Sequence, residues 1–290
     1  LVRGGQLVPV PMSPLAFART PLLTRGGKLR MLAEPFVRGG DPSGESVAEF
    51  AARRLGCEAR DALIAPFLTG VYAGDENQLG AEAVFPSLVA AERRSGSIVR
   101  GMLAQAFRGS GPKGRAGTWS GAEGISSFTD ALAAPLGDAL RVSARASNVV
   151  FEDGAYRVEI ETESGAQTLR ARALVLALPA QPASRLLGAL DAEAANAMGS
   201  IESAPVASVA LSVASDATRV PVRGFGYLVP RGEGEVLLGC LFMSRLFAGR
   251  APAGRELLTL LSAGRRKPAA IEWSDDQLID FMLAKPILIN

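Results

Sequence analysis

The chain has 290 residues, of which 48% are hydrophobic and 21% are charged, so it can bury a substantial core. Its 31 basic and 29 acidic residues give a formal net charge of +2 without a basic stripe, and no nucleic-acid partner is expected. The absence of histidine excludes Ser-His-Asp catalysis, Cys-His catalysis and histidine-ligated metals. Any chemistry must therefore come from a cofactor or from carboxylates.

Cysteine usage and hydropathy bear on the compartment. Cys57 and Cys240 are far apart and form no CxxC motif, so a reducing compartment is favoured and we expect a cytoplasmic protein. The longest apolar run, near residues 173–180, is too short to span a bilayer, and no signal peptide is recognisable. Because Leu1 lies inside a strand–turn–strand pattern, we expect the chain to be part of something longer.

Residues 46–107 are predicted to be nearly all helical. Turns and one short helix occupy the first forty residues, and a capping box of Ser46 and Glu49 then opens a helix that Gly56 ends. The other predicted helical stretches are residues 28–36, 58–68 and 81–107. Pro86 and Gly96 should bend or break the last of these.

Residues 108–117 form a loop by composition and mark a boundary. A helix is expected at 124–136. Period-2 alternation then predicts strands at 140–151, 156–163 and 167–178, with a hairpin turn at 152–154. Residues 173–178 are apolar on both faces and end at Pro179, which is typical of a central strand covered on both sides.

The last third is predicted to hold a second, antiparallel sheet. Two helices are expected between residues 180 and 200. Strands are expected at 206–213, 225–229 and 235–242. A second capping box, from Ser274 to Gln277, opens a helix that ends near Ala284. The predicted fold class is therefore α+β or α/β, and the residues alone leave the function open.

Few side chains indicate chemistry by themselves. No P-loop motif is intact and no GxGxxG follows any predicted strand, while Gly121 with Gly124 could hold a phosphate or simply open a helix. Four carboxylates lie in turns, where local hydrogen bonds favour them: Asp75, Glu76, Glu152 and Asp153. Four aromatic residues on the last predicted strands are expected to pack in the core rather than line a ligand site: Phe225, Tyr227, Phe242 and Phe247.

A resemblance to a known family carries the interpretation further. The segment Thr69–Asp75 (TGVYAGD), followed by FPSL at 85–88 and ERRSGSI at 92–98, resembles the helical segment of protoporphyrinogen oxidases, the flavoenzymes of porphyrin and haem synthesis. Other stretches agree with that family in order and spacing: 123–128, 176–179, 224–230 and 238–242. The resemblance covers residues 7–282, with Glu123 in place of the family's first glycine.

The resemblance implies an FAD-linked, amine oxidase-like fold with an antiparallel substrate-domain sheet. The implied parts are substrate-domain segments at 1–45 and 186–290, a helical membrane-associating segment at 46–110 and an FAD-domain segment at 118–185. The family's N-terminal βαβ unit with GxGxxG, and its arginine that pairs with a substrate propionate, would lie before Leu1. Its glycine-rich flavin segment would lie beyond Asn290.

The implied reaction is oxidation of protoporphyrinogen IX to protoporphyrin IX, with FAD as cofactor and molecular oxygen as acceptor. The cofactor supplies the redox step, and no catalytic side chain is assigned. The resemblance places the substrate against Gly70, Val206, Val222 and Phe242, and FAD against Ala146 and Ala177. A one-residue register difference would move the adenine contact to Ser147. Two alternatives stay open: coproporphyrinogen III oxidation by the same fold, and a non-catalytic porphyrin- or lipid-binding fragment.

The resemblance also implies a peripheral contact between the helices of residues 46–107 and a membrane surface. The candidate contacts are the apolar residues Leu63, Ile64, Phe67 and Leu68 and the basic residues Arg93, Arg94 and Arg100. Packing inside the domain is the other interpretation of the apolar residues. A homodimer is left open.

Overall fold

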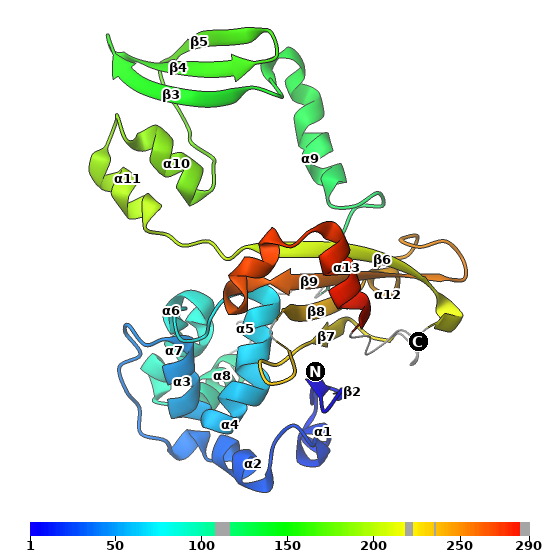
Figure 1. Cartoon of the computed structure of the whole chain (residues 1–290). Coiled ribbons are helices and arrows are strands. Elements are labelled where there is room, and N and C mark those ends of the chain that lie inside the picture. Colours follow the sequence, from blue (N-terminus) through cyan, green and yellow to red (C-terminus); the bar gives the residue numbers. More distant parts are fainter. Residues whose placement is uncertain (108–116, 218–222, 235, 285–290) are drawn as a thin grey trace. The chain divides into compact units, whose positions relative to one another are not determined.

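The computed structural model describes residues 1–107, 117–217, 223–234 and 236–284, and the chain forms two compact units (Figure 1). The first unit combines residues 1–117 and 204–290, and the second is residues 118–203. The boundary expected at 108–117 adjoins the first division, although residues 108–116 lie outside the described part. The boundary expected after residue 185 falls inside helix α10 (Ala180–Leu187), and the functional assignment of the four segments stays a prediction.

A four-stranded antiparallel sheet forms the centre of the first unit, in the order β6-β9-β8-β7. Its strands are β6 (Val206–Ala214), β7 (Gly226–Leu228), β8 (Leu237–Phe242) and β9 (Arg255–Ala263). The three strands predicted from alternation are confirmed. Strand β9 was not predicted, yet it links β6 to β8 along almost its whole length.

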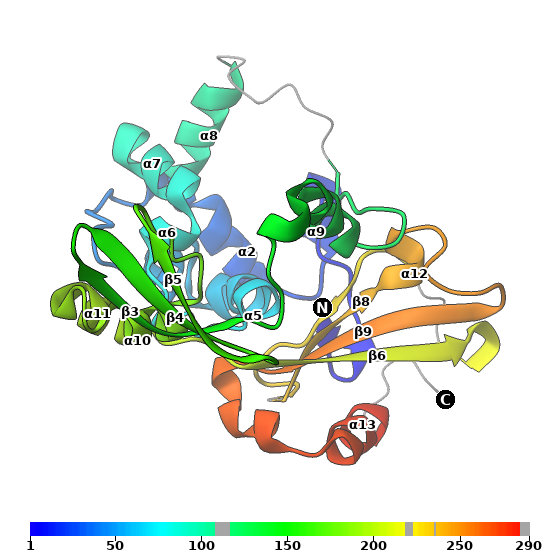
Figure 2. The same cartoon turned by 90° about the horizontal axis from the view of Figure 1, so that it is seen from above.

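The two faces of this sheet differ in burial because side chains alternate along each strand. One face carries Tyr227, Cys240, Phe242, Leu258 and Leu260, all buried in one cluster with Met282 of α13 (Asp275–Ala284). Figure 2 shows α13 along one side of the sheet and α5 (Ala65–Tyr72) along the other.

We call the side that α5 lies along the open face, because the β6 residues on it are exposed. It consists of Val206, Ser208, Ala210, Ser212, Leu228, Leu241, Leu257, Thr259 and Leu261. Its β6 residues are exposed and the others are half-buried. The described part of the first unit therefore offers one sheet surface on which a ligand could lie.

The helical block of the first unit follows the predicted pattern closely. It comprises α3 (Val47–Leu55), α4 (Cys57–Ala59), η2 (Arg60–Ile64), α5, α6 (Ala81–Val84), α7 (Pro86–Ser95) and α8 (Ile98–Phe107). The Ser46 capping box is present, and Gly56 ends α3 with φ +95°. Breaks occur at Pro86 and Gly96 as predicted, and five residues form a π-helical turn, η2, before α5.

The amino-terminal forty residues are more helical than predicted. They form the hairpin β1 (Val2–Arg3) and β2 (Gln6–Leu7), then α1 (Pro14–Arg19), α2 (Arg25–Leu32) and η1 (Glu34–Phe36). The predicted strand–turn–strand start is confirmed. Helix α1 was not predicted; its N-cap Ser13 accepts a hydrogen bond from the Ala16 amide, and Pro14 occupies the first helical position.

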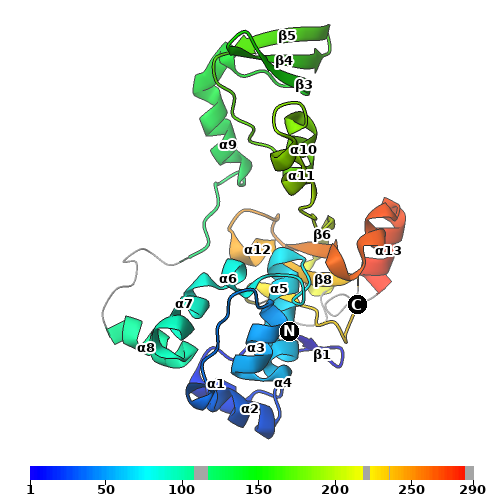
Figure 3. The same ribbon diagram turned by 90° about the vertical axis from the view of Figure 1, so that its left-hand side faces the viewer.

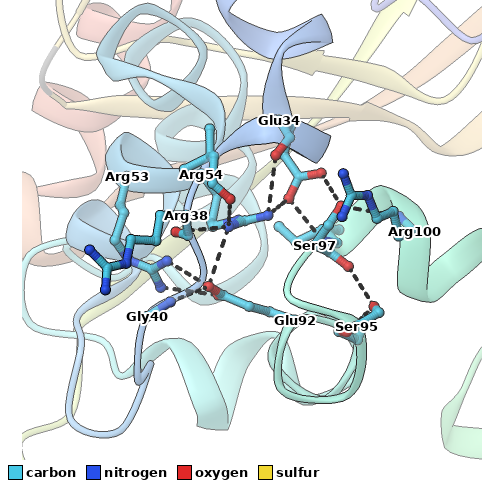
Figure 4. A network of polar contacts seen from close by, with 12 residues as sticks. Glu34, Arg38, Gly40, Arg53, Arg54, Glu92, Ser95, Ser97 and Arg100 are labelled. Carbon is cyan, nitrogen blue, oxygen red and sulfur yellow. Dashed lines mark hydrogen bonds and ion pairs between the residues drawn. The ribbon is translucent and has the colours of Figure 1, made fainter.

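A buried ion network joins three parts of the helical block (Figure 4). Arg54 of α3 is 0% exposed and pairs with Glu34 of η1 and, at 3.4 Å, with Glu92 of α7. Ser97 donates a hydrogen bond of 2.7 Å to Glu34. Arg53 contacts Glu92 from the rim at 2.6 Å. These contacts fasten η1 and α7 to α3, beside an apolar core that includes Val47, Phe50 and Leu68.

The second unit is a three-stranded antiparallel sheet with helices. Its elements are α9 (Ser126–Ala133), η3 (Ala134–Ala139), β3 (Arg145–Glu152), β4 (Ala155–Thr162), β5 (Gly165–Ala171), α10 and α11 (Ala192–Gly199). The predicted hairpin is confirmed: Asp153 and Gly154 have φ of +50° and +72°, as a type I′ turn requires. Figure 3 shows α10 and α11 side by side, and Leu186 of α10 packs with Val149 of β3.

The predicted central strand at residues 173–178 is wrong for this structure. Strand β5 ends at Ala171, and within the described chain residues 173–178 pair with no strand. Leu174 and Leu176 pack against the sheet core, whereas Val175 is 87% exposed. A central strand needs a hydrogen-bonded neighbour on each side, and the second unit supplies neither.

Short elements complete the first unit. They are η4 (Ser215–Ala217), α12 (Met243–Leu246), η5 (Gly264–Arg266) and η6 (Pro268–Glu272). The Ser274 capping box is present before α13, with reciprocal hydrogen bonds between Ser274 and Gln277. Among the described residues, no helix combines the length and apolar character needed to cross a membrane.

Candidate functional site

A pocket of about 590 Å³ lies in the second unit, between the start of β3 and α10. Its apolar lining is Ala144, Ala146, Leu178, Pro182 and Leu186. Its polar lining is Arg145, Ser147, Glu161 and Arg185. A flat, largely apolar ligand with a charged end would match this combination.

Strand β3 presents an unpaired backbone edge near this pocket. In the order β3-β4-β5 it is an outer strand, so one edge has no strand partner in the described chain. Its pairing with β4 is irregular between Ala146 and Asn148, which leaves Ser147 in a bulge. The Ser147 hydroxyl donates to the Glu159 carbonyl at 3.3 Å. Free backbone donors and acceptors therefore accompany the pocket wall.

Of the two predicted FAD contacts, the structure places one at the pocket. Ala146 lines it, and the bulge puts Ser147, the one-residue register alternative, at the same wall. Ala177 is exposed and does not line the pocket, but its neighbour Leu178 does. Both assignments as FAD contacts stay predictions, with a cavity now described beside Ala146.

The predicted substrate residues fall on different sides of the large sheet. Val206 begins β6 on the open face and is 42% exposed. Phe242 pairs with Leu258 and lies on the buried face, 2% exposed, with its ring 6.1 Å from that of Tyr227. One flat ligand on the open face would contact Val206 and not Phe242. Val222 lies outside the described residues.

Gly70 lies where α5 packs against the sheet. A Cβ atom on Gly70 would lie 2.1 Å from Cδ2 of Leu228 on β7, so the glycine allows the helix to approach this strand closely. That contact explains the residue type without a ligand. It also places Gly70 on the same side of the sheet as Val206.

A strained turn at the end of β9 holds the segment around Gly70. Ala263 and Gly264 have φ of +74° and +64°, and Ala73, at the end of α5, has φ +48°. The Arg265 amide donates to the Ala73 carbonyl at 2.9 Å. Sequence reasoning missed this arrangement because the turn and α5 are far apart in the chain. Positive φ at two alanines costs free energy that the surrounding contacts must offset.

Arg266 adds side-chain contacts to that turn. Its guanidinium donates to the Thr69 hydroxyl at 2.7 Å and to the Val229 carbonyl at 2.8 Å. Thr69 is 0% exposed and directly precedes Gly70. Arg266 therefore ties α5 to the residue after β7, on either side of the contact between Gly70 and Leu228.

Other candidate groups have structural surroundings. Burial raises the pKa of the Cys240 thiol to about 12, against the opposing effect of a hydrogen bond with Tyr227, so this thiol stays protonated. Asp75 accepts hydrogen bonds from Asn77 in a turn, and the backbone amide nitrogen of Asn77 lies 2.9 Å from Oδ1 of Asp75. Across the described ranges, no group of His, Cys, Asp and Glu side chains could hold a metal ion.

Comparisons with known proteins extend these observations. The family model for flavin containing amine oxidoreductase matches residues 3–284. The chloroplastic protoporphyrinogen oxidase of Nicotiana tabacum is 33% identical over 310 residues, which cover 97% of this chain and 56% of that protein. The protoporphyrinogen oxidase of Bos taurus is 35% identical over 241 residues, covering 78% of this chain and 48% of that protein.

The coproporphyrinogen III oxidase of Bacillus subtilis is 24% identical over 285 residues, which cover 96% of this chain and 60% of that protein. The chain thus spans about half the length of the curated relatives it matches.

Solved structures share the fold. A candidate protoporphyrinogen oxidase from Exiguobacterium sp. 255-15 superposes with a TM-score of 0.75 at 23% identity, covering 97% of this chain and 60% of that one. Putrescine oxidase bound to putrescine gives a TM-score of 0.57 at 15% identity, with 96% and 60% coverage. These likenesses confirm the mixed α/β, amine oxidase-like fold class. Since the family match also extends over nearly the whole sequence, the chain belongs to the family of flavin-containing amine oxidoreductases.

Proposed function

We propose that the chain is part of an FAD-dependent oxidoreductase that converts protoporphyrinogen IX to protoporphyrin IX, with molecular oxygen as acceptor. The observation that carries this proposal is 33% identity to the tobacco protoporphyrinogen oxidase over 97% of the chain. The coproporphyrinogen III oxidase of Bacillus subtilis is less similar, at 24% identity. Family membership implies FAD as the cofactor.

The residues around the pocket of the second unit fit part of FAD. The apolar walls at Ala146, Leu178 and Pro182 suit a flat ring, and the unpaired edge of β3 offers peptide groups to its polar rim. When bound, FAD accepts the electrons of the reaction. The tasks of this chain are to hold the adenine end and to keep water from it.

The open face of the first unit supports an apolar substrate. Val206, Leu257 and Leu261 contribute apolar surface. The side chains of Ser208 and Ala210 are small, so a flat ligand could lie close to the backbone of β6. We propose that the flat macrocycle lies on this face, where Gly70 and Val206 are close to its path. Phe242 would then not contact the macrocycle, and its role would be to pack in the core on the buried face of the sheet.

The charge of the open face separates the two candidate substrates. Apart from Arg255 at one end, which is hydrogen bonded to Ser212, the face has no charged residue in the described chain. Coproporphyrinogen III carries more carboxylates than protoporphyrinogen IX, and buried carboxylates need basic partners. An uncharged face therefore favours protoporphyrinogen as the substrate.

The test is a turnover comparison on a protein elongated to the length of the relatives. We expect oxygen-dependent oxidation of protoporphyrinogen IX to exceed that of coproporphyrinogen III. Ala210→Arg should lower turnover of protoporphyrinogen IX, because it puts a charge on the apolar face. The matched control is Ala197→Arg, which changes an exposed alanine of α11 in the second unit. Preference for coproporphyrinogen III would favour the alternative substrate. Porphyrin binding without turnover would favour the non-catalytic module.

We also propose a peripheral membrane contact for the helical block, on a different surface from the one expected. Leu68 is 0% exposed and Ile64 packs against the same core, so neither is available to a bilayer. Arg93 is paired with Glu82. Exposed apolar residues instead gather on η1 and α8: Phe36, Val99, Met102, Leu103 and Phe107.

Exposed basic residues accompany this surface, which suits anionic headgroups. They are Arg38, Arg94 and Arg100. In sedimentation with anionic vesicles, Leu103→Glu should reduce binding more than Phe67→Glu, because Phe67 also stacks on Phe85 at 6.2 Å within the block. Equal binding of Leu103→Glu and the unmodified chain would contradict the proposal. A cytoplasmic location and a homodimer stay predictions, and the tobacco relative is chloroplastic.

A further inference from the structure

The turn at residues 263–266, which follows β9, is bonded to two elements that border the open face. The backbone amide of Gly264 donates to the carbonyl of Pro205 at 2.7 Å, and Pro205 directly precedes β6. The next amide, that of Arg265, donates to the carbonyl of Ala73 at 2.9 Å, at the end of α5. One short turn therefore links the start of β6 to the end of α5.

The backbone of this turn is strained and closely packed. Ala263 has φ +74° and ψ −103°, a conformation that is costly for a residue with a side chain. A Cβ atom on Gly264 would lie 2.8 Å from the carbonyl oxygen of Ala73 and 3.1 Å from Cδ1 of Leu238. Strained backbone persists where the surrounding contacts hold it, and it is commonly found at functional sites. We expect the turn to relax if its contacts with α5 are lost.

Arg266 supplies the side-chain part of the same link. Its guanidinium donates to the Thr69 hydroxyl at 2.7 Å and to the Val229 carbonyl at 2.8 Å. The Thr69 hydroxyl donates in turn to the carbonyl of Ala65, one helical turn earlier, at 2.9 Å. Because a guanidinium is a planar fork with fixed donor directions, these bonds set the distance between α5 and the end of β7. Thr69 is 0% exposed and directly precedes Gly70, so the position of Gly70 depends on Arg266.

We propose that Arg266 is a positioning residue for the substrate, which keeps Gly70 and Val206 at the spacing that the flat macrocycle requires. The side chain acts through Thr69, and the turn that carries it acts on β6. This inference rests on the proposed function, which places the macrocycle on the open face beside these two residues. Dispersion contacts weaken steeply with distance, so a shift of α5 would loosen the fit of a planar ring. Arg266 should therefore affect the affinity for the macrocycle rather than the redox step.

The first measurement is a fluorescence titration of the intact 290-residue chain with protoporphyrin IX. We expect Arg266→Met to weaken binding about three- to tenfold, which corresponds to the net effect of one hydrogen bond. Thr69→Val keeps the shape of the side chain, removes the hydroxyl and should have the same effect. The double variant should bind no more weakly than Arg266→Met alone, because both substitutions remove one shared interaction.

Two further variants separate position from charge. Arg266→Lys keeps the charge and one donor, so it should recover part of the lost affinity. Lys267→Met is the matched control, because it removes a positive charge from the neighbouring residue, whose side chain is exposed. We expect it to bind protoporphyrin IX as the unmodified chain does.

A merely structural role for Arg266 predicts a different result. Unfolded molecules would lower the number of binding sites in the titration without changing the dissociation constant of those that remain. In the protein elongated to the length of the relatives, Arg266→Met should raise KM for protoporphyrinogen IX and leave kcat unchanged. A fall in kcat with the same KM would instead indicate loss of folded enzyme, which melting curves of each variant measure separately.

The inference is overturned by an unchanged dissociation constant in Arg266→Met, by additive losses in the double variant, or by the absence of porphyrin binding to the unmodified chain. An equal loss in Lys267→Met would also overturn it, since charge alone would then explain the effect. If the elongated protein binds porphyrin but does not turn over protoporphyrinogen IX, the proposed function fails, and the titration still decides the role of Arg266.

Discussion

Arg54 is a charged residue at the centre of an apolar helical block. Its guanidinium is held between Glu34 and Glu92, which come from elements on either side of α3. Because all three side chains are essentially unexposed, none of their charges is solvated by bulk water. The network is therefore stabilising only as a complete set, since each missing partner leaves a buried charge behind.

Arg54→Met should lower the free energy of unfolding by about 3 to 5 kcal/mol, because it leaves the buried Glu34 carboxylate without a cation, whereas Glu92 keeps its contact with Arg53. Urea denaturation of the intact chain measures this loss. Arg60→Met is the control: its partner Asp61 is 61% exposed, and such pairs contribute about 0 to 1 kcal/mol. Equal losses in the two variants would contradict the role given to burial.

The same network predicts a pH dependence through Glu34. Burial alone would raise the pKa of this carboxyl, but hydrogen bonds from Ser97, Arg54 and the amides of Ile98 and Val99 outweigh it, and the pKa is lowered. A carboxyl whose pKa is lower in the folded state stabilises the fold above its ordinary pKa of about 4.5 and loses that effect in more acidic solution.

Glu34→Gln should therefore be less stable than the unmodified chain at neutral pH. The difference in unfolding free energy should shrink as the pH falls below about 4.5. Urea denaturation at a series of pH values measures it. A difference that stays constant down to the acid limit of folding would show that Glu34 does not titrate differently in the two states.

At the scale of elements, the contact between α5 and β7 depends on Gly70. Alanine is favoured over glycine in a helix by about 1 kcal/mol, but here its methyl group would collide with Leu228. We expect Gly70→Ala to destabilise the chain by about 1 to 3 kcal/mol in thermal or urea unfolding, the usual cost of overpacking.

Two variants check the cause. Gly70→Ala combined with Leu228→Ala should cost less than the two single losses added together, since the shorter side chain removes the collision. Gly26→Ala on α2 has no close neighbour within 3.4 Å and should be neutral or slightly stabilising. Additive losses in the double variant would point to the backbone of α5 rather than to Leu228.

Elements governed by local chemistry could be predicted from the sequence. The capping boxes at Ser46 and Ser274 and the Asp153–Gly154 turn involve residues within a few positions of each other. Strand β9 could not, because its leucines suit a helix as well as a strand and its identity depends on partners far along the chain. Residues 173–178 show the reverse case, in which a strand pattern has no partner to pair with.

The same distinction between local and long-range relations applies to the candidate site. A pocket lies beside Ala146, whose contact with FAD stays a prediction, whereas the relation between Val206 and Phe242 depends on a register that passes through β9. Without that strand, the faces of β6 and β8 could not be compared. The turn that binds α5 through Arg266 joins residues nearly two hundred positions apart, beyond any local pattern.

At the scale of the whole molecule, the question is whether the isolated chain retains flavin. The pocket of the second unit is proposed to hold the adenine end, but no predicted strand of the sequence is followed by a GxGxxG loop, and such loops with their helix amides hold the pyrophosphate. We expect the purified 290-residue chain to be colourless and without oxidase activity. An absorption spectrum measures flavin content, with a version elongated by a dinucleotide-binding unit as the positive control. Stoichiometric FAD in the isolated chain would contradict this prediction.

The unpaired segment at residues 173–178 also affects how the isolated chain behaves in concentrated solution. Ala-Leu-Val-Leu-Ala-Leu has no charge, and its backbone edges are free within the described chain, so two copies could pair through them. Arg172 and Pro179 flank the run and act as gatekeepers that limit this association. Light scattering should rise with protein concentration, and Val175→Lys, at a site already 87% exposed, should suppress the rise without lowering the melting temperature. If the prediction holds, six residues without a partner strand promote association of the isolated chain.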